Sequence, residues 1–141
     1  MQMIDTIGSV QAESGGAPKV LIVDDDAAIR KMLVDVLSLE GFQTETARDG
    51  REALGLLEDG TRRILLLDLM MPVMDGWQLC RHLAERPALR QCCSIILMSA
   101  GEKLEQARDL EVEGYLAKPF DVDHLLELLE PLVSGAKSLG A

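Results

Sequence analysis

Polar residues with complementary chemistry follow short apolar segments at separate places in this chain. They are two neighbouring carboxylates, a further carboxylate, a hydroxyl and an amine, namely Asp24, Asp25, Asp68, Ser99 and Lys118. Carboxylate oxygens are the ligands that Mg²⁺ prefers, and a carboxylate can also attack phosphorus to form an acyl phosphate. A hydroxyl and a lysine can bind the oxygens of an arriving phosphoryl group. Brought together, these residues would form a site for phosphoryl transfer.

Each of these residues alone is also typical of an ordinary turn. An acidic triplet such as 24–26 often only caps the helix that follows it, and a single Asp after an apolar segment is commonly a turn residue. Four segment ends that carry mutually compatible groups are far less common by chance. The combination therefore favours a functional site over four unrelated turns.

The segments that must position these groups alternate between two patterns. Short apolar runs predict strands over residues 19–23, 43–47, 64–67, 95–98 and 115–117. Helical spacing predicts helices over residues 27–40, 51–57, 76–83, 103–110 and 122–133, with Gly41 ending the first and Asp49 and Asp121 as N-caps. Five strands alternating with five helices predict an α/β fold, a doubly wound parallel sheet covered on both faces.

The order of the strands decides whether the carboxylates meet. With strand order 2-1-3-4-5, the first and third strands are neighbours about 4.8 Å apart. Asp24, Asp25 and Asp68 then share one pocket at the carboxyl edge of the sheet. Three adjacent carboxylates repel one another, and a divalent cation such as Mg²⁺ would relieve that repulsion.

Composition limits the classes of function. The 141 residues carry a net charge of −10, which argues against binding to nucleic acid. No apolar run approaches the roughly 20 residues of a membrane span, and residues 1–18 lack the features of a secretion signal, so we expect a cytoplasmic protein with no membrane contact. We expect a flexible leader over 1–18, one domain over 19–133 and a flexible tail over 134–141, with no output domain in this sequence.

Several motifs resemble those of response-regulator receiver domains of two-component signalling. They are VLIVDDD (20–26), ARDGREAL (47–54), LLLDLMMPVMDG (65–76), ILMSA (96–100) and GYLAKPF (114–120). The resemblance spans residues 19–133 and implies the flavodoxin-like receiver fold, with sheet order 2-1-3-4-5. Its most specific part is the segment around Asp68.

The resemblance implies a role for each acidic residue. Asp68 would be the phosphoacceptor and Asp25 a direct ligand of Mg²⁺, while Asp24 would act largely through water. The backbone carbonyl of Met70 would complete the protein's share of the metal ligands.

The same resemblance implies a switch at the next two strand ends. Ser99 would move to the phosphoryl group, and Tyr115 would swing inward behind it. Lys118 would bind a phosphoryl oxygen, and Pro119 would follow a cis peptide bond.

Partners follow from the family as well. A sensor histidine kinase or a histidine phosphotransfer protein would donate the phosphoryl group. A downstream protein would bind the surface of the fourth helix, fifth strand and fifth helix. The alternatives are a phosphorelay intermediate that passes the group to a histidine, and a receiver held by a kinase. In none of these is the chain an enzyme beyond its own phosphorylation and slow dephosphorylation.

Two departures and one rival family deserve weight. The interval from Ser99 to Lys118 is shorter than usual, and Glu111 stands where the family often has glycine, which predicts strain if φ is positive there. Haloacid-dehalogenase-like phosphatases also use an Asp after a strand, but they need a second Asp where this chain has Met70. A P-loop and a calcium loop are excluded because their glycine, lysine and glutamate positions are not matched.

Overall fold

The computed structural model describes residues 17–134. Most of the predicted leader and tail, residues 1–16 and 135–141, lies outside this part, so the predicted boundaries of the domain stay predictions.

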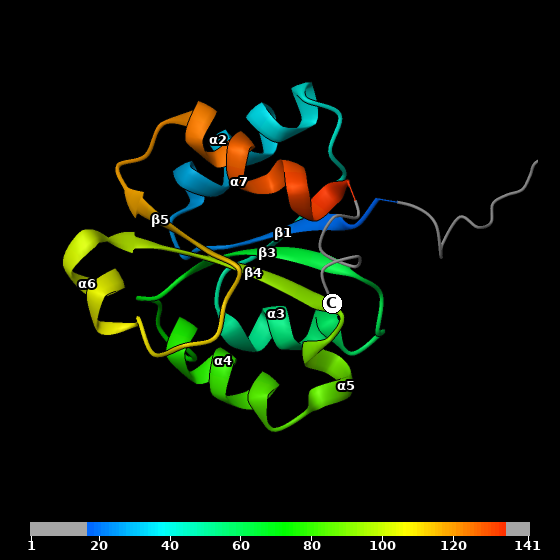
Figure 1. Cartoon of the computed structure of the whole chain (residues 1–141), viewed down its shortest axis with the longest axis vertical. Helices are drawn as coiled ribbons and strands as arrows, with labels where there is room; N and C mark the ends of the chain where they lie inside the picture. The colour runs from blue at the N-terminus through cyan, green and yellow to red at the C-terminus, as the bar shows by residue number, and fades with distance from the viewer. Residues whose placement is uncertain (1–16, 135–141) are drawn as a thin grey trace, which may run out of the picture.

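A five-stranded parallel sheet forms the centre of the fold, in the predicted order β2-β1-β3-β4-β5 (Figure 1). Its strands are β1 (Lys19–Val23), β2 (Thr44–Ala47), β3 (Arg63–Asp68), β4 (Cys93–Ala100) and β5 (Gly114–Lys118). The prediction of a doubly wound parallel sheet is confirmed. The observed strands differ from the predicted ranges by at most two residues at either end, and β1 matches its prediction.

Six helices, rather than five, surround the sheet in the described residues. They are α2 (Ala27–Leu39), α3 (Gly50–Leu57), α4 (Gly76–Ala84), α5 (Pro87–Arg90), α6 (Gly101–Gln106) and α7 (Val122–Val133). The additional helix is α5, a single turn that begins at Pro87, whose fixed φ suits a first helical position. The helix predicted over residues 103–110 lies earlier in the chain: α6 begins directly after β4 and ends at Gln106.

Side chains alternate between the two faces of the sheet and build a core on each. Leu21 and Val23 pack with α3, α4, α5 and α6 on one face. Val20 and Ile22 pack with α2 and α7 on the other. Figure 1 shows these two helix layers above and below the sheet. Because the central residues of β1, β3 and β4 are buried on both faces, they form continuous apolar runs, which is why these strands are recognisable in the sequence.

Register and caps fix the carboxyl edge of the sheet. Val23 pairs with Leu67, so the first residues beyond β1 lie beside Asp68. Asp26 caps α2 by accepting hydrogen bonds from the amides of Ala28 and Ile29.

No helix in residues 17–134 is both long enough and apolar enough to cross a membrane.

Candidate functional site

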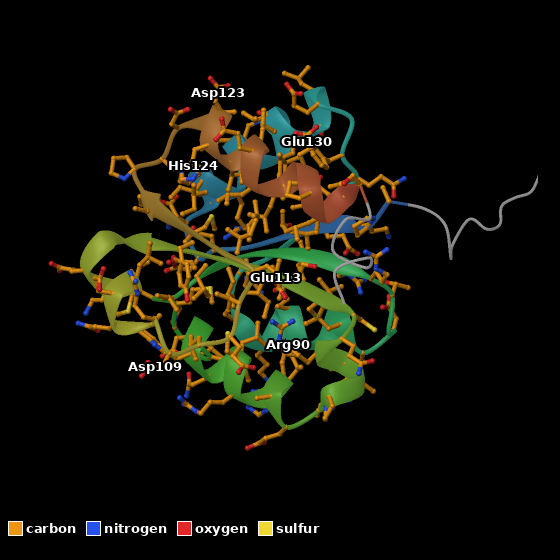
Figure 2. The ribbon with its side chains drawn as sticks, viewed as in Figure 1. Arg90, Asp109, Glu113, Asp123, His124 and Glu130 are labelled. Atoms are coloured by element: carbon orange, nitrogen blue, oxygen red, sulfur yellow. The ribbon has the colours of Figure 1, made fainter. Side chains whose placement is uncertain are left out.

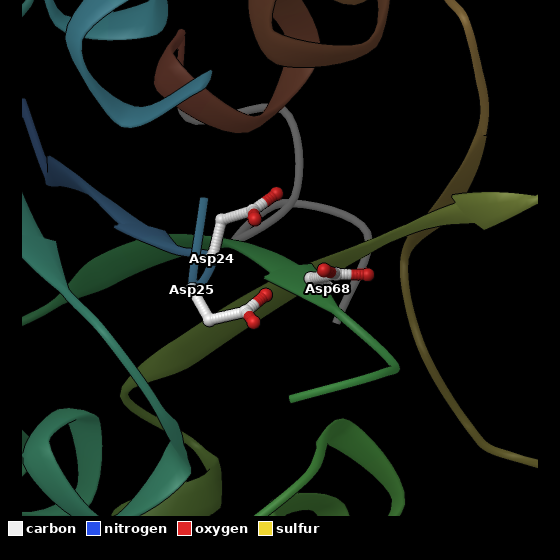
Figure 3. A group of neighbouring side chains, drawn as sticks. All are labelled: Asp24, Asp25 and Asp68. Carbon is white, nitrogen blue, oxygen red and sulfur yellow. The ribbon is translucent and has the colours of Figure 1, made fainter. Parts of the chain in front are cut away.

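Three carboxylates meet at the ends of β1 and β3. Asp24, Asp25 and Asp68 each offer an oxygen, and these oxygens lie within 4.8 Å of one another (Figure 3). Asp24 and Asp68 are buried, whereas Asp25 is exposed to solvent. The sequence predicted that these three residues share one pocket, and the structure brings them together there.

A single lysine faces the two buried carboxylates. Lys118 Nζ lies 2.7 Å from Asp24 Oδ2 and 3.4 Å from Asp68 Oδ2. Lys118 ends β5, two strands away from Asp68, and is 23% exposed. One ammonium group therefore serves two buried carboxylates, which leaves excess negative charge in the pocket.

This excess charge perturbs the acid–base properties of Asp68. Burial, followed by the charge of Asp24, raises the pKa of Asp68 to about 6, although Lys118 and the amide of Met70 oppose the rise. Burial lowers the pKa of Lys118, but its hydrogen bond to Asp24 and the charge of Asp68 outweigh that effect and raise the pKa overall. Asp68 is thus a carboxylate whose charged form is poorly stabilised by the protein alone.

The loop after Asp68 packs so closely that it requires glycine at one position. A Cβ on Gly76 would lie 2.7 Å from the carbonyl oxygen of Asp68 and 2.9 Å from Leu69 Cα. Asp75, just before it, forms a capping box with Gln78 that begins α4. The DG pair of the sequence motif therefore holds the backbone of Asp68 against the start of α4.

Arg30 supports the site from α2 and was missed in the sequence. Its Nη1 donates a hydrogen bond of 2.7 Å to the backbone carbonyl of Asp24. This contact ties the first turn of α2 to the loop that carries Asp24 and Asp25. The available signal was a basic residue six positions after Asp24, one helical turn beyond the N-cap Asp26.

The predicted switch residues lie on adjacent strands but in different environments. Ser99, near the end of β4, is 4% exposed. Tyr115, in β5, is 36% exposed, and its hydroxyl lies 3.4 Å from the carbonyl oxygen of Leu110. The outward tyrosine is held to the loop before β5 rather than packed behind Ser99.

Two further predicted residues lie beside the pocket. The Lys118–Pro119 peptide bond is cis. Met70 is exposed, and its amide donates to Asp68 Oδ1 at 3.4 Å. The predicted role of its carbonyl as a metal ligand stays a prediction.

The predicted backbone strain occurs at a different residue. Among the described residues other than glycine, only Val73 has a positive φ, at 69°. Glu111 therefore does not adopt the left-handed conformation, and the condition under which strain was predicted there is not met. The strain lies in the loop after Asp68, at a β-branched residue for which this conformation is unfavourable.

The donor set fits a divalent cation. Three carboxylates are hard oxygen ligands, and burial followed by the charge of Asp24 raises the pKa of Asp68, so a cation bound here would stabilise its charged form. Asp25, exposed to solvent, leaves room for water in the coordination shell.

A family model for the response regulator receiver domain matches residues 20–130. Because the match covers more than half of the chain, the protein belongs to this family.

Curated relatives agree with this assignment. The chain is 35% identical over 118 residues to the response regulator MprA of Mycolicibacterium vanbaalenii, covering 82% of this chain and 50% of that protein. It is 34% identical over 122 residues to the phosphate regulon transcriptional regulatory protein PhoB of Rhizobium meliloti, covering 85% and 54%. The chain thus spans about half the length of the curated relatives it matches.

Solved structures share the fold over nearly their whole length. A receiver domain of a signal transduction histidine kinase from Syntrophus aciditrophicus superimposes with a TM-score of 0.77 at 31% identity, covering 86% of this chain and 93% of that one. A CheY-like receiver domain protein from Methanospirillum hungatei gives a TM-score of 0.74 at 33% identity, covering 86% and 98%. The predicted family and fold are confirmed.

Proposed function

We propose that the chain is a phosphoacceptor switch that takes a phosphoryl group from a partner's phosphohistidine onto Asp68. A carboxylate oxygen of Asp68 attacks the phosphorus, a P–O bond forms, and the P–N bond to the imidazole breaks. The imidazole leaves with the electron pair of that bond and takes up a proton. The products are an aspartyl phosphate on this chain and a neutral histidine on the donor.

The observation that carries the proposal is the imbalance of charge around Asp68. Its buried carboxylate shares one lysine with Asp24, and its pKa is raised to about 6. Ionised at neutral pH yet poorly stabilised, it is suited to react with an electrophilic phosphorus. Lys118 Nζ lies 3.4 Å from Asp68, and this proximity supports the proposal that it binds an oxygen of the incoming group.

We propose Mg²⁺ as the cation, held by Asp25 and Asp68 with Asp24 acting largely through water. When bound, it would neutralise charge on the phosphoryl oxygens. The protein holds the three carboxylates together at one edge of the sheet. The hydrogen bond from Arg30 to the carbonyl of Asp24 and the close packing of Gly76 against Asp68 fix the backbone at this edge.

The proposed response is a change at the surface formed by α6, β5 and α7. A phosphoryl oxygen would accept a hydrogen bond from Ser99, and the shift of that residue would open space for Tyr115 to turn inward. The weak contact of 3.4 Å between Tyr115 and Leu110 is the local restraint that this motion must break. A downstream protein would then distinguish the two surfaces.

A phosphorelay role is the alternative. One of the similar solved structures is a receiver domain of a histidine kinase, and this similarity supports considering a phosphorelay role as well. Movement of labelled phosphate from Asp68 to a histidine phosphotransfer protein would favour the relay, and retention of the label would favour the switch.

We propose that this chain does not bind nucleic acid, on the ground of its net charge of −10. One relative, about twice as long, is named a transcriptional regulatory protein, so the expectation does not extend to longer proteins of the family. We also propose that the chain catalyses no reaction except those of its own phosphoryl group.

Labelling with a small acyl phosphate tests the acceptor. We expect stoichiometric labelling of the wild type in Mg²⁺, none in Asp68→Asn, and little in Asp25→Ala or with excess chelator. Asp35→Asn, a change on the exposed surface of α2, is the matched control and should label normally. Undiminished labelling of Asp68→Asn would refute the acceptor, and full labelling in chelator would refute the metal requirement.

We propose that the aspartyl phosphate decays slowly. Met70 and Gly101, two residues after Asp68 and Ser99, offer no side-chain group to orient an attacking water. A Cβ on Gly101 would meet nothing within 4 Å, so a larger side chain fits there. Met70→Asn with Gly101→Glu should shorten the lifetime about tenfold, equal to roughly 1.4 kcal/mol of barrier. Faster decay of the wild type than of the double variant, after the donor is removed, would contradict the proposal.

A further inference from the structure

A groove lies between the end of α2 and the length of α7, on the face of the sheet opposite α3 and α4. It has a volume of about 590 Å³. Its apolar lining comes from Phe42, Leu126 and Val133, which are each partly buried against the core of that face. These side chains leave an apolar floor open to solvent.

Acidic side chains border this floor. They are Glu40 at the end of α2 and Asp123, Glu127 and Glu130 on α7, and all four are exposed. Figure 2 shows Asp123 and Glu130 on α7, in the layer that contains α2. Within residues 17–134, none of the four makes an ion pair, and no lysine or arginine lines the groove.

Three other glutamates of the described residues are paired with arginines. Glu58 pairs with Arg86 at 2.6 Å, Glu113 with Arg90 at 3.2 Å, and Glu105 with Arg108 at 3.2 Å. Figure 2 shows Arg90 and Glu113 together on the other side of the sheet. The groove differs from those pairs because it combines four acids that have no ion pair in residues 17–134 with an apolar floor.

The spacing along α7 matches a helical partner. Asp123, Glu127 and Glu130 follow one another at intervals of four and three residues, and so lie on one stripe of the helix. Leu126 and Val133, seven residues apart, lie on a neighbouring stripe. An acidic stripe parallel to an apolar stripe complements a helix whose apolar face is flanked by lysine or arginine.

We propose that the groove between α2 and α7 binds a basic amphipathic helix of a partner protein. The apolar face of that helix would cover Phe42, Leu126 and Val133, and its cations would pair with Glu40, Glu127 and Glu130. A second copy of this chain is disfavoured, because like charges would face each other across the contact. The surface shares only α7 with the proposed output surface and does not depend on phosphorylation of Asp68.

A peptide of Leu and Lys, about 14 residues long and helical with the leucines on one face, is the probe. We expect it to bind the unphosphorylated chain and to lose about tenfold in affinity with Glu40→Gln, Glu127→Gln and Glu130→Gln combined. The matched control is Glu85→Gln, Glu102→Gln and Glu111→Gln combined, three exposed acids without ion pairs elsewhere. It changes net charge equally and should retain wild-type affinity. Leu126→Gln should also weaken binding, whereas a scrambled peptide without an apolar face should bind poorly to all variants.

Equal weakening by both triple variants would show binding to net charge alone and would overturn the proposal. So would dimerisation that the groove variant abolishes, since the occupant would then be a second copy. Tighter peptide binding after deletion of residues 135–141 would show that this chain's own end occupies the groove, and would equally overturn it. Circular dichroism and urea unfolding of each variant establish that it is folded.

Discussion

Strand β3 begins and ends with a buried charged side chain, and the two ends differ in how far neighbouring charges compensate it. Arg63, its first residue, is 2% exposed and faces two carboxylates, with Nε 2.7 Å from Glu45 and Nη1 2.8 Å from Asp59. Asp68, its last residue, shares one lysine with a second buried carboxylate. At the amino end the charge of the buried ion is more than compensated; at the carboxyl end it is not.

The pKa shifts have opposite consequences at the two ends. Hydrogen bonds first to Asp59 and then to Glu45 raise the pKa of Arg63 further above its usual range, so its charge is secure. Burial and Asp24 raise the pKa of Asp68 to about 6, so its charge is costly. The comparison indicates that the charges at the amino end stabilise the fold, whereas the ionised Asp68 at the carboxyl end lowers the free energy of unfolding unless a cation binds there.

The two ends of the sheet also differ in which residues adopt the left-handed backbone conformation. At the amino end, Gly41 and Gly60 occupy left-handed turns with φ of 92° and 75°, which glycine adopts without strain. At the carboxyl end, the corresponding conformation falls on Val73. Strain, like uncompensated charge, is confined to the end that carries the site.

The largest expected effect is at the amino end. Glu45→Gln combined with Asp59→Asn should lower the free energy of unfolding by about 3–5 kcal/mol, because it leaves the Arg63 guanidinium buried without a counter-charge. Arg63→Met removes the buried charge itself and should cost less. Urea unfolding measures both, and a smaller loss for the double variant than for Arg63→Met would break the comparison.

A stabilising change is expected at the carboxyl end. In chelator at pH 7.5, Asp68→Asn should raise the free energy of unfolding by about 1–3 kcal/mol, since it removes a carboxylate that the fold disfavours in its charged form. The folded pKa of about 6 lies above the ordinary value near 4, so the wild type loses stability as pH rises through this window. The advantage of the variant should therefore shrink from pH 7 towards pH 4. An advantage that grew as pH fell would have the wrong sign.

The smallest effect concerns Val73. Val73→Gly should raise the free energy of unfolding by about 1 kcal/mol, because the relief of left-handed strain exceeds the entropy that glycine adds to the unfolded chain. Gly60→Val, the reverse change in the turn before β3, should destabilise by a similar amount. If Val73→Gly were destabilising in the same urea measurement, strain in this loop would not be a feature of the site.

Much of this arrangement was predictable from sequence because it depends on chain order and burial. The central residues of β1, β3 and β4 are apolar on both faces, so the ends of these strands, and hence Asp24, Asp25 and Asp68, could be located directly. The Arg63 cluster was not predicted, since residues 45, 59 and 63 meet only through the packing of β2 beside β1 and the turn before β3. Arg30 was missed for a different reason: its partner is a backbone carbonyl, and a basic residue six positions after Asp24 is only a weak signal for such a contact.

The displaced α6 and the unexpected α5 show where local pattern is insufficient. Both helices are short, with six and four residues, so periodicity has little length in which to appear. The left-handed conformation, which was considered for Glu111, occurs at Val73 for a similar reason. The sign of φ depends on how a loop closes, and a residue type other than glycine does not disclose it.

Stabilisation by Mg²⁺ is the most direct test of the central claim, that the carboxylates at the carboxyl end of β3 require a divalent cation, whereas the ion pairs of Arg63 balance the charge at the amino end. Adding Mg²⁺ should raise the urea midpoint of the wild type, by mass action on the folded state, and should raise that of Glu45→Gln/Asp59→Asn by the same increment. Asp25→Ala and Asp68→Ala should gain little. An equal gain in all four proteins, or none in the wild type, would contradict the account.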